Sequence, residues 1–149
     1  MNTLIAIALS SVAAGTLDIL SAVFLAKKRG MSFTALLQFV ASGALGKAAF
    51  QGGPGTAAAG MFFHYLIALL WAAAYFLLGD KLPEPLMHPI AFGALYGIVV
   101  HMVMSLVVIP LSRTPKRPFS WQPWLIQLPI HIAFVGLPIA LVQSWWLRG

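Results

Sequence analysis

Four long apolar stretches alternate with short polar segments along this chain. The apolar stretches cover residues 4–26, 56–78, 88–111 and 123–146. Each is long enough to cross a hydrocarbon core of about 30 Å as an α-helix. The segments between them contain lysine, arginine, glycine and proline, which end helices or stay in water. The pattern predicts an all-α membrane protein with four transmembrane helices in a single domain, residues 1–149.

A fifth segment, residues 31–51, is helical in pattern but only moderately apolar. Gln38 and Lys47 interrupt it, and the sequence GGPG at 52–55 breaks the helix. We predict a re-entrant or interfacial helix here. Such a helix is allowed at membrane depth only where its polar groups face protein or a water-filled cavity.

The basic residues decide between four spans and five. If residues 31–51 do not cross, Lys27–Arg29, Lys47 and the basic loop 113–117 all lie on one side of the membrane. If they do cross, the first and last of these groups fall on opposite faces. Because short cytoplasmic loops carry the excess of lysine and arginine, the first arrangement is favoured. It predicts a basic cytoplasmic side and places both termini outside.

Composition agrees with a membrane location. Of the 149 residues 60% are hydrophobic and 8% are charged, and the mean hydropathy is +0.91. Soluble domains carry about 25% charged residues. The net charge of +6 sits in short loops beside the apolar stretches, which favours anionic lipid headgroups over nucleic acid as the partner. The chain has no cysteine, which excludes disulfides and thiolate metal sites.

Small residues and a histidine recur every four positions in the third span. Gly93, Gly97, His101 and Ser105 therefore line one stripe of a helix. A stripe of small residues lets a neighbouring helix approach closely, and polar groups on it are shielded from lipid. We expect His101 to face the interior of the bundle.

Each predicted span carries one ionisable residue at a similar depth. These are Asp18, His64, His101 and His131. With a rise of 1.5 Å per residue, all of them lie about 12–17 Å from the predicted cytoplasmic edge. Ionisable groups in a membrane face the bundle interior and find partners, because exposure to lipid is costly. We predict that they form an intramembrane polar site, to which Gln38 is added.

Several functions compete for this polar layer. Three imidazoles and the Asp18 carboxylate suit a transition metal, and Met61 and Met104 beside two of the histidines suit copper(I). A haem would take His64 with His101 or His131. A proton or ion relay would use Asp18 and the histidines. In the plainest alternative, the polar groups only hold the helices together.

Near the start of the second span, a glycine-rich segment resembles a phosphate loop. It lacks the G-K-[ST] order that places lysine and hydroxyl on a nucleotide. A weaker alternative is an anion or lipid-headgroup site at Lys47, Gly53, Gly55 and Thr56, because free N–H groups at a helix start attract anions. The other interpretation is a flexible hinge.

Six sequence pieces together resemble a family of small bacterial inner-membrane proteins that carry a domain of unknown function. The pieces are GTLDIL at 15–20, LLQFVASGALGKAAFQGG at 36–53, the 60–64 stretch, GALYG at 93–97, VVIPLS at 107–112 and HIAFVGLPIAL at 131–141. The resemblance covers most of the chain. It implies a multi-span protein of the bacterial inner (cytoplasmic) membrane and implies no activity.

The function predicted from the sequence is transport or sensing of a small solute, ion or proton by the Asp/His cluster. One alternative is an accessory or assembly subunit with a purely structural cluster, and another is a haem- or metal-binding subunit; no cofactor is required. Enzyme activity is not expected, because Asp18 is the sole acidic residue within a span. A single bundle of this size has little internal volume, which favours a homo-oligomer or a place in a larger membrane complex.

Overall fold

The computed structural model describes residues 3–82, 84–116 and 118–148, and these residues are helical with no strand among them. The elements are α1 (Thr3–Lys28), α2 (Phe33–Leu45), η1 (Gly46–Gln51), α3 (Gly53–Lys81), α4 (Glu84–Met87), α5 (Pro89–Val103), η2 (Met104–Val108), α6 (Ile109–Leu111), α7 (Trp121–His131), η3 (Ile132–Gly136) and α8 (Leu137–Arg148). The first of the η segments is a 3-10 helix, and η2 and η3 are π-helical.

Five helical segments of the described chain are long and apolar enough to cross a membrane. They are Thr3–Lys28, Phe33–Gln51, Gly53–Lys81, Pro89–Leu111 and Trp121–Leu147. The all-α membrane fold predicted from the sequence is thus confirmed. Four of the five agree with the predicted spans to within a few residues. The agreement is close because the thickness of the hydrocarbon core sets the length of the apolar run that a spanning helix needs.

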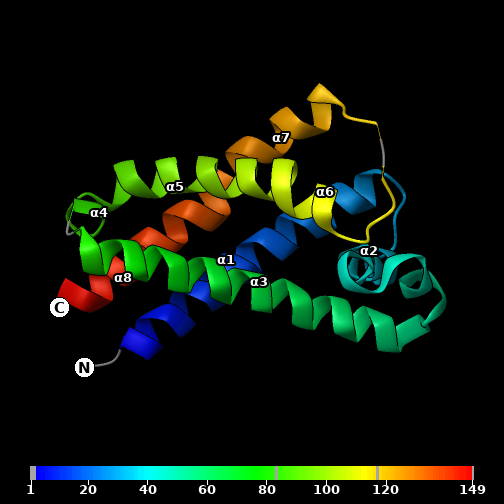
Figure 1. The fold of residues 1–149 in the computed structure, drawn as a ribbon, viewed down its shortest axis with the longest axis horizontal. Coiled ribbons are helices and arrows are strands. Elements are labelled where there is room, and N and C mark those ends of the chain that lie inside the picture. The colour runs from blue at the N-terminus through cyan, green and yellow to red at the C-terminus, as the bar shows by residue number, and fades with distance from the viewer. Residues whose placement is uncertain (1–2, 83, 117, 149) are drawn as a thin grey trace.

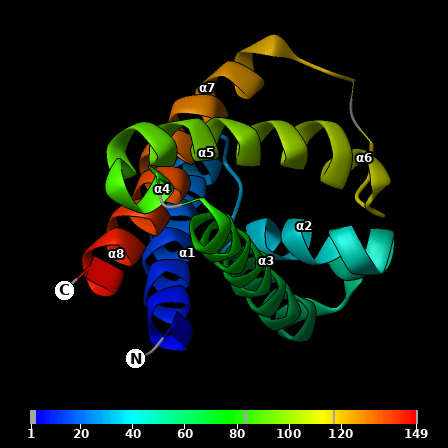
Figure 2. The same ribbon diagram turned by 60° about the vertical axis from the view of Figure 1, so that its left-hand side comes forward.

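The fifth segment lies differently from the other four. Figure 1 looks almost along the axis of α2, whereas α3 runs across the picture, and Figure 2 again shows α2 crosswise to α1. The other four segments run between two ends of the bundle. One end, which we call the basic end, holds the last turn of α1, α2, η1 and the connection from α6 to α7 (Figure 1). The first turn of α1, α4 and the last turn of α8 lie at the other end.

Hydrogen bonds fix both ends of the bundle. At the basic end, the N–H of Arg113 donates to the carbonyl of Gly43 over 2.9 Å, and the Ser42 hydroxyl donates to the Thr114 hydroxyl over 3.3 Å. The loop after α6 therefore rests on α2. At the other end, the Tyr75 hydroxyl donates to the carbonyl of Pro85 over 2.8 Å. Because both ends of α2 lie at the basic end, the arrangement agrees with a helix that does not cross.

Glycine contacts set how closely α5 approaches the last span. A Cβ at Gly136 would overlap the carbonyl oxygen of Gly93, and a Cβ at Gly97 would lie 2.5 Å from Cα of Ile132. The backbones therefore touch along the stripe that contains Gly93, Gly97 and His101, as its spacing predicts. Ser105 lies within the π-helical turn η2.

Both π-helical turns end two residues before a proline. η2 ends at Val108, before Pro110, and η3 ends at Gly136, before Pro138. Proline has no N–H to donate, and its ring crowds the carbonyl four residues earlier, so an α-helical turn cannot form without distortion. A wider π turn relieves that crowding. The same local rule therefore shapes the two helices on either side of the Gly93–Gly136 contact.

The crossing of α2 and α3 generates a stability prediction. A Cβ added at Gly60 would overlap the carbonyl group of Leu37, whereas a Cβ at Gly55 on the same helix meets nothing within 4 Å. Because backbone cannot move aside as a side chain can, we expect Gly60→Ala to lower the free energy of unfolding by at least about 1–3 kcal/mol. Thermal unfolding in lipid nanodiscs measures this, with Gly55→Ala as the matched control. Equal melting temperatures for both variants would contradict the observed crossing.

The crosswise position of α2 generates a topology prediction. Single cysteines at Arg29 and Gln51, which flank the α2–η1 segment and are exposed, should react from the same side of a sealed vesicle as one at Lys116. A cysteine at Glu84 should react from the opposite side. The natural chain has no cysteine, so the background is clean. If α2 and η1 cross the membrane instead, Arg29 and Gln51 will react from opposite sides.

Candidate functional site

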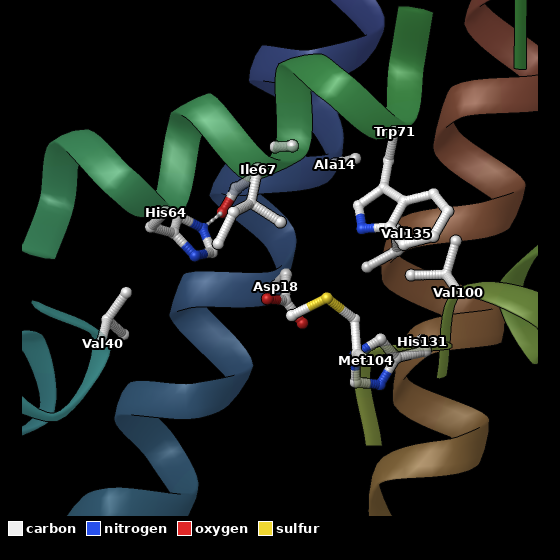
Figure 3. A pocket seen from close by; sticks show the side chains of 12 residues that line it. Ala14, Asp18, Val40, His64, Ile67, Trp71, Val100, Met104, His131 and Val135 are labelled. Carbon is white, nitrogen blue, oxygen red and sulfur yellow. Dashed lines mark hydrogen bonds between the residues drawn. The ribbon is translucent and has the colours of Figure 1, made fainter. Parts of the chain in front are cut away.

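A cavity of about 190 Å³ lies where the helices meet in the middle of the bundle. Its walls come from α1, α2, α3, α5, η2, α7 and η3 (Figure 3). Most of the lining is apolar, and includes Ile67, Val100 and Val135. The polar, aromatic or sulfur-containing side chains that line it are Asp18, His64, Trp71, Met104 and His131. Three of the five residues predicted for the intramembrane site therefore share one cavity.

Asp18 lies on α1, half-buried, and faces this cavity. Figure 3 shows its carboxylate in the space between His64, Met104 and His131. Among the described residues it makes no side-chain hydrogen bond and no ion pair; the ion pair that is present joins exposed Asp80 and Lys81 over 3.1 Å. A carboxylate at this depth is costly unless it finds a partner. Asp18 therefore presents an acceptor to whatever enters the cavity.

His64 is fixed by the backbone of α1. Its Nε2 lies 2.7 Å from the carbonyl oxygen of Gly15 (Figure 3). Because a carbonyl only accepts, Nε2 carries the proton, and Nδ1 of the neutral ring is left as an acceptor. The absence of a side chain at Gly15 permits this approach, since a Cβ there would lie 2.9 Å from the Tyr65 ring. Thr16 and Tyr65 join their hydroxyls over 3.0 Å beside it.

His131 is fixed in the same manner by its own helix. Its Nδ1 donates to the carbonyl of Gln127 over 2.9 Å, so Nε2 of the neutral ring is an acceptor. The histidines of the cavity wall thus both hold a proton on the nitrogen that faces backbone. Each keeps a lone pair on the other nitrogen. In their neutral forms, the two histidines offer acceptor nitrogens to the space that the Asp18 carboxylate also borders.

His101 does not line the cavity. It lies behind His131, with ring centroids 5.0 Å apart, and against Trp124 at 4.7 Å. Its side chain is 2% exposed, and neither ring nitrogen has a hydrogen-bond partner in the described chain. The four ionisable residues predicted as one layer therefore divide into three at the cavity and one behind it.

Gln38 has a structural position away from the cavity. Its buried Nε2 donates to the carbonyl of Gly53 over 3.1 Å and to the hydroxyl of Thr56 over 3.4 Å. That hydroxyl in turn donates to the carbonyl of Ala49 over 2.6 Å. Gln38 and Thr56 thereby tie α2 and η1 to the start of α3. Val40, on the same helix, reaches the cavity wall instead.

The predicted anion site is not assembled at the start of α3. The Thr56 hydroxyl that was expected to meet an anion is engaged with Ala49 and Gln38. Lys47 and Gly55 are exposed, and the Lys47 ammonium makes no hydrogen bond or ion pair with the described residues. Gly53 has a φ of +55°, a value that glycine adopts without strain. The segment is therefore a turn held by side chains.

The donor set does not suit a metal or a haem. In the described ranges, no group of three or more His, Asp or Glu side chains could hold a metal ion. The shell predicted from Asp18, His64, His101 and His131 is thus not formed. Haem fits poorly for a different reason: a cavity of about 190 Å³ is smaller than the ~300–1,000 Å³ of ordinary ligand pockets.

Sequence reasoning missed Trp71 as a part of the cavity wall. His64, Ala68 and Trp71 all line the cavity, and their spacing of four and then three residues places them on one helix face. That spacing is visible in the sequence and could have found Trp71. Buried Gln143 was also missed: its Nε2 donates to the Ser10 hydroxyl over 3.1 Å and to the carbonyl of Ala72 over 2.7 Å, which joins three helices.

Comparison of the chain with protein-family models, curated proteins and solved structures finds no match. The class of protein that the fold and the site define is a helical membrane protein with an acidic, histidine-lined internal cavity. The resemblance to small bacterial inner-membrane proteins remains a prediction. The functional argument therefore rests on the geometry of the cavity.

The hydrogen bonds of the two cavity histidines predict opposite tautomers. At a pH where the rings are neutral, ¹⁵N NMR of labelled protein in nanodiscs should find the proton of His64 on Nε2 and that of His131 on Nδ1. His88, which is exposed at a helix start and makes no side-chain cap bond, should show the averaged spectrum of exchanging tautomers. The same averaged spectrum for His64 or His131 would contradict the assignment.

Proposed function

We propose that this protein moves or senses a small solute, ion or proton across the membrane through its internal cavity, with Asp18 as the group that binds it. The observation that carries the proposal is the Asp18 carboxylate, which faces a cavity and has no hydrogen-bond or ion-pair partner among the described residues. A charged group held inside a membrane protein marks substrate, ion or proton pathways, because its cost is otherwise unrecovered.

A purely structural role leaves part of the polar cluster unexplained. The structural role requires that polar groups bond to one another across helices. Gln143 does this through Nε2, although its Oε1 is buried without a partner in the described chain, and His64 does it with one nitrogen. The second nitrogen of His64, the second nitrogen of His131 and the whole Asp18 carboxylate are left over. These remaining groups support binding of something that enters the cavity.

The proposed setting is the bacterial inner membrane, with the basic end in the cytoplasm and both termini outside. Lys27, Lys28, Arg29, Lys47, Arg113 and Lys116 are exposed at the basic end. The other end carries Asp80, Lys81 and Glu84. This difference supports the orientation through the excess of basic residues in cytoplasmic loops. Large exposed side chains such as Leu70 and Ile90 give the outer surface the apolar character that lipid requires.

The function is tested by flux into proteoliposomes that contain the full chain and a trapped pH-sensitive dye. A membrane potential is imposed, first without added solute and then with a panel of small inorganic and organic ions. We expect the wild-type protein to exceed protein-free vesicles under at least one condition, and Asp18→Asn to return to the protein-free rate because the amide carries no charge and takes up no proton.

Asp80→Asn is the matched control. It makes the same chemical change at an exposed helix end, where it removes a pair with Lys81 that contributes little. It should leave the flux unchanged. If the wild-type protein never exceeds protein-free vesicles, or if Asp18→Asn folds and conducts normally, the structural interpretation replaces the proposal.

A further inference from the structure

We propose that the ligand of this cavity is a small protonated amine, with its ammonium group on Asp18 and its carbon atoms against Trp71 and the apolar wall. This inference rests on the proposed function, since it names the solute of the same site. Figure 3 shows the elements of the argument together: the carboxylate from α1, the indole from α3 and the thioether of Met104 from η2 project into one space.

Charge is the first criterion. The Asp18 carboxylate lines the cavity, and no cationic side chain of the described residues makes an ion pair with it. A negative charge at this depth of a membrane protein is costly without a partner, and a ligand that brings one positive charge removes most of that cost. The occupant is therefore a monovalent cation or a proton. An anion would be repelled by the carboxylate, and a neutral molecule would leave its charge without a counter-charge.

The scarcity of oxygen ligands separates an organic cation from a hard metal ion. Ca²⁺ takes 6–8 oxygen ligands and Mg²⁺ demands a near-ideal octahedron. K⁺ likewise needs a ring of carbonyl oxygens to replace its water. Asp18 alone supplies side-chain oxygen to the cavity wall, and the nearby carbonyl of Gly15 is occupied by His64. An ammonium ion needs fewer oxygen ligands, because each N–H group makes its own directed bond.

Trp71 and the apolar lining favour a cation that carries carbon. Indole is the best aromatic partner for a cation, and the interaction strengthens when water is excluded. Ile67, Val100 and Val135 offer the methyl and methylene contacts that an alkyl group needs. A relay that handles only protons needs neither feature, since a chain of waters requires polar walls. At about 190 Å³, the cavity suits a ligand of a few heavy atoms.

The histidine tautomers favour an ammonium group that bears N–H. In their neutral forms, His64 and His131 each keep an unprotonated nitrogen, because the other nitrogen donates to the carbonyl of Gly15 or Gln127. Together with Asp18 they form a set of acceptors with no competing charged donor on the wall. A primary ammonium has three N–H groups to satisfy these acceptors. A quaternary ammonium has none, so it gains only the charge and the aromatic contact.

The test is equilibrium binding of radiolabelled methylammonium to the full chain in lipid nanodiscs. Nanodiscs enclose no compartment, so no pH gradient can accumulate the amine. We expect saturable binding that ethylammonium displaces, that tetramethylammonium displaces at least about tenfold less well, and that sodium and potassium do not displace. Asp18→Asn should weaken binding at least about tenfold because a charge-assisted hydrogen bond is lost. Trp71→Leu should weaken it about threefold to thirtyfold, with Trp71→Phe between Trp71→Leu and the wild type.

Two controls separate a site effect from a general effect. Asp80→Asn and Trp145→Leu make the same kinds of change at exposed positions, and both should bind like the wild type. If Asp18→Asn does not fold, the Trp71 variants carry the test. The proposal is overturned if the wild type shows no saturable binding, if sodium competes as well as ethylammonium, or if folded Asp18→Asn and Trp71→Leu bind normally.

The flux assay distinguishes failure of this inference from failure of the proposed function. Flux of protons or of another ion that falls in Asp18→Asn, together with no methylammonium binding, would overturn the amine and leave the proposed function standing. A wild-type protein with neither binding nor flux would overturn both. Methylammonium binding that depends on Asp18 and Trp71 supports the amine, whatever the rate of flux.

Discussion

The crossing of α1 over α3 at Gly15 organises the cavity. Because Gly15 has no side chain, the ring of Tyr65 lies where a Cβ would stand, and the helices come close enough for His64 to bond the Gly15 carbonyl. Asp18 follows about one turn later on the same face and opens into the space beside this contact. The glycine therefore does two things at once: it seals one wall of the cavity, and it determines which nitrogen of His64 is free.

The opposite wall depends on a second close approach, between α5 and η3. Gly93 and Gly136 touch through their backbones, and each of the two helices has a π turn beside this contact. Met104 lies at the start of one π turn, and His131 lies one residue before the other. Proline explains why the turns are there. Two of the groups that line the cavity with Asp18 thus lie at or beside irregular backbone.

Sequence reasoning predicted the helical membrane fold well because apolar length is a local property. It predicted that Asp18, His64 and His131 lie at one level of the bundle for the same reason, since the position along a helix depends on the rise per residue. It did not separate His101, which lies behind the cavity, from the three residues that line the cavity. That separation depends on how each helix is rotated about its own axis. The Gly93–Gly97–His101 stripe did contain this information: a residue on a face that packs against a neighbouring helix is covered by that helix. Gln38 was misplaced because its partners, Gly53 and Thr56, become neighbours only through the turn at η1.

If the proposed function holds, the charge of the Asp18 carboxylate can be neutralised in the cavity in two ways. Asp18 is satisfied either by a proton or by a cation that enters beside it, and it cannot hold both charges at once. Whatever favours one therefore disfavours the other by the same free energy, because the two binding equilibria are linked. His64 and His131 border the same space, and in their neutral forms each offers it one acceptor nitrogen. A site that merely held helices together would gain stability from a permanent partner for Asp18. Leaving the carboxylate open is the expected arrangement only if its partner comes and goes.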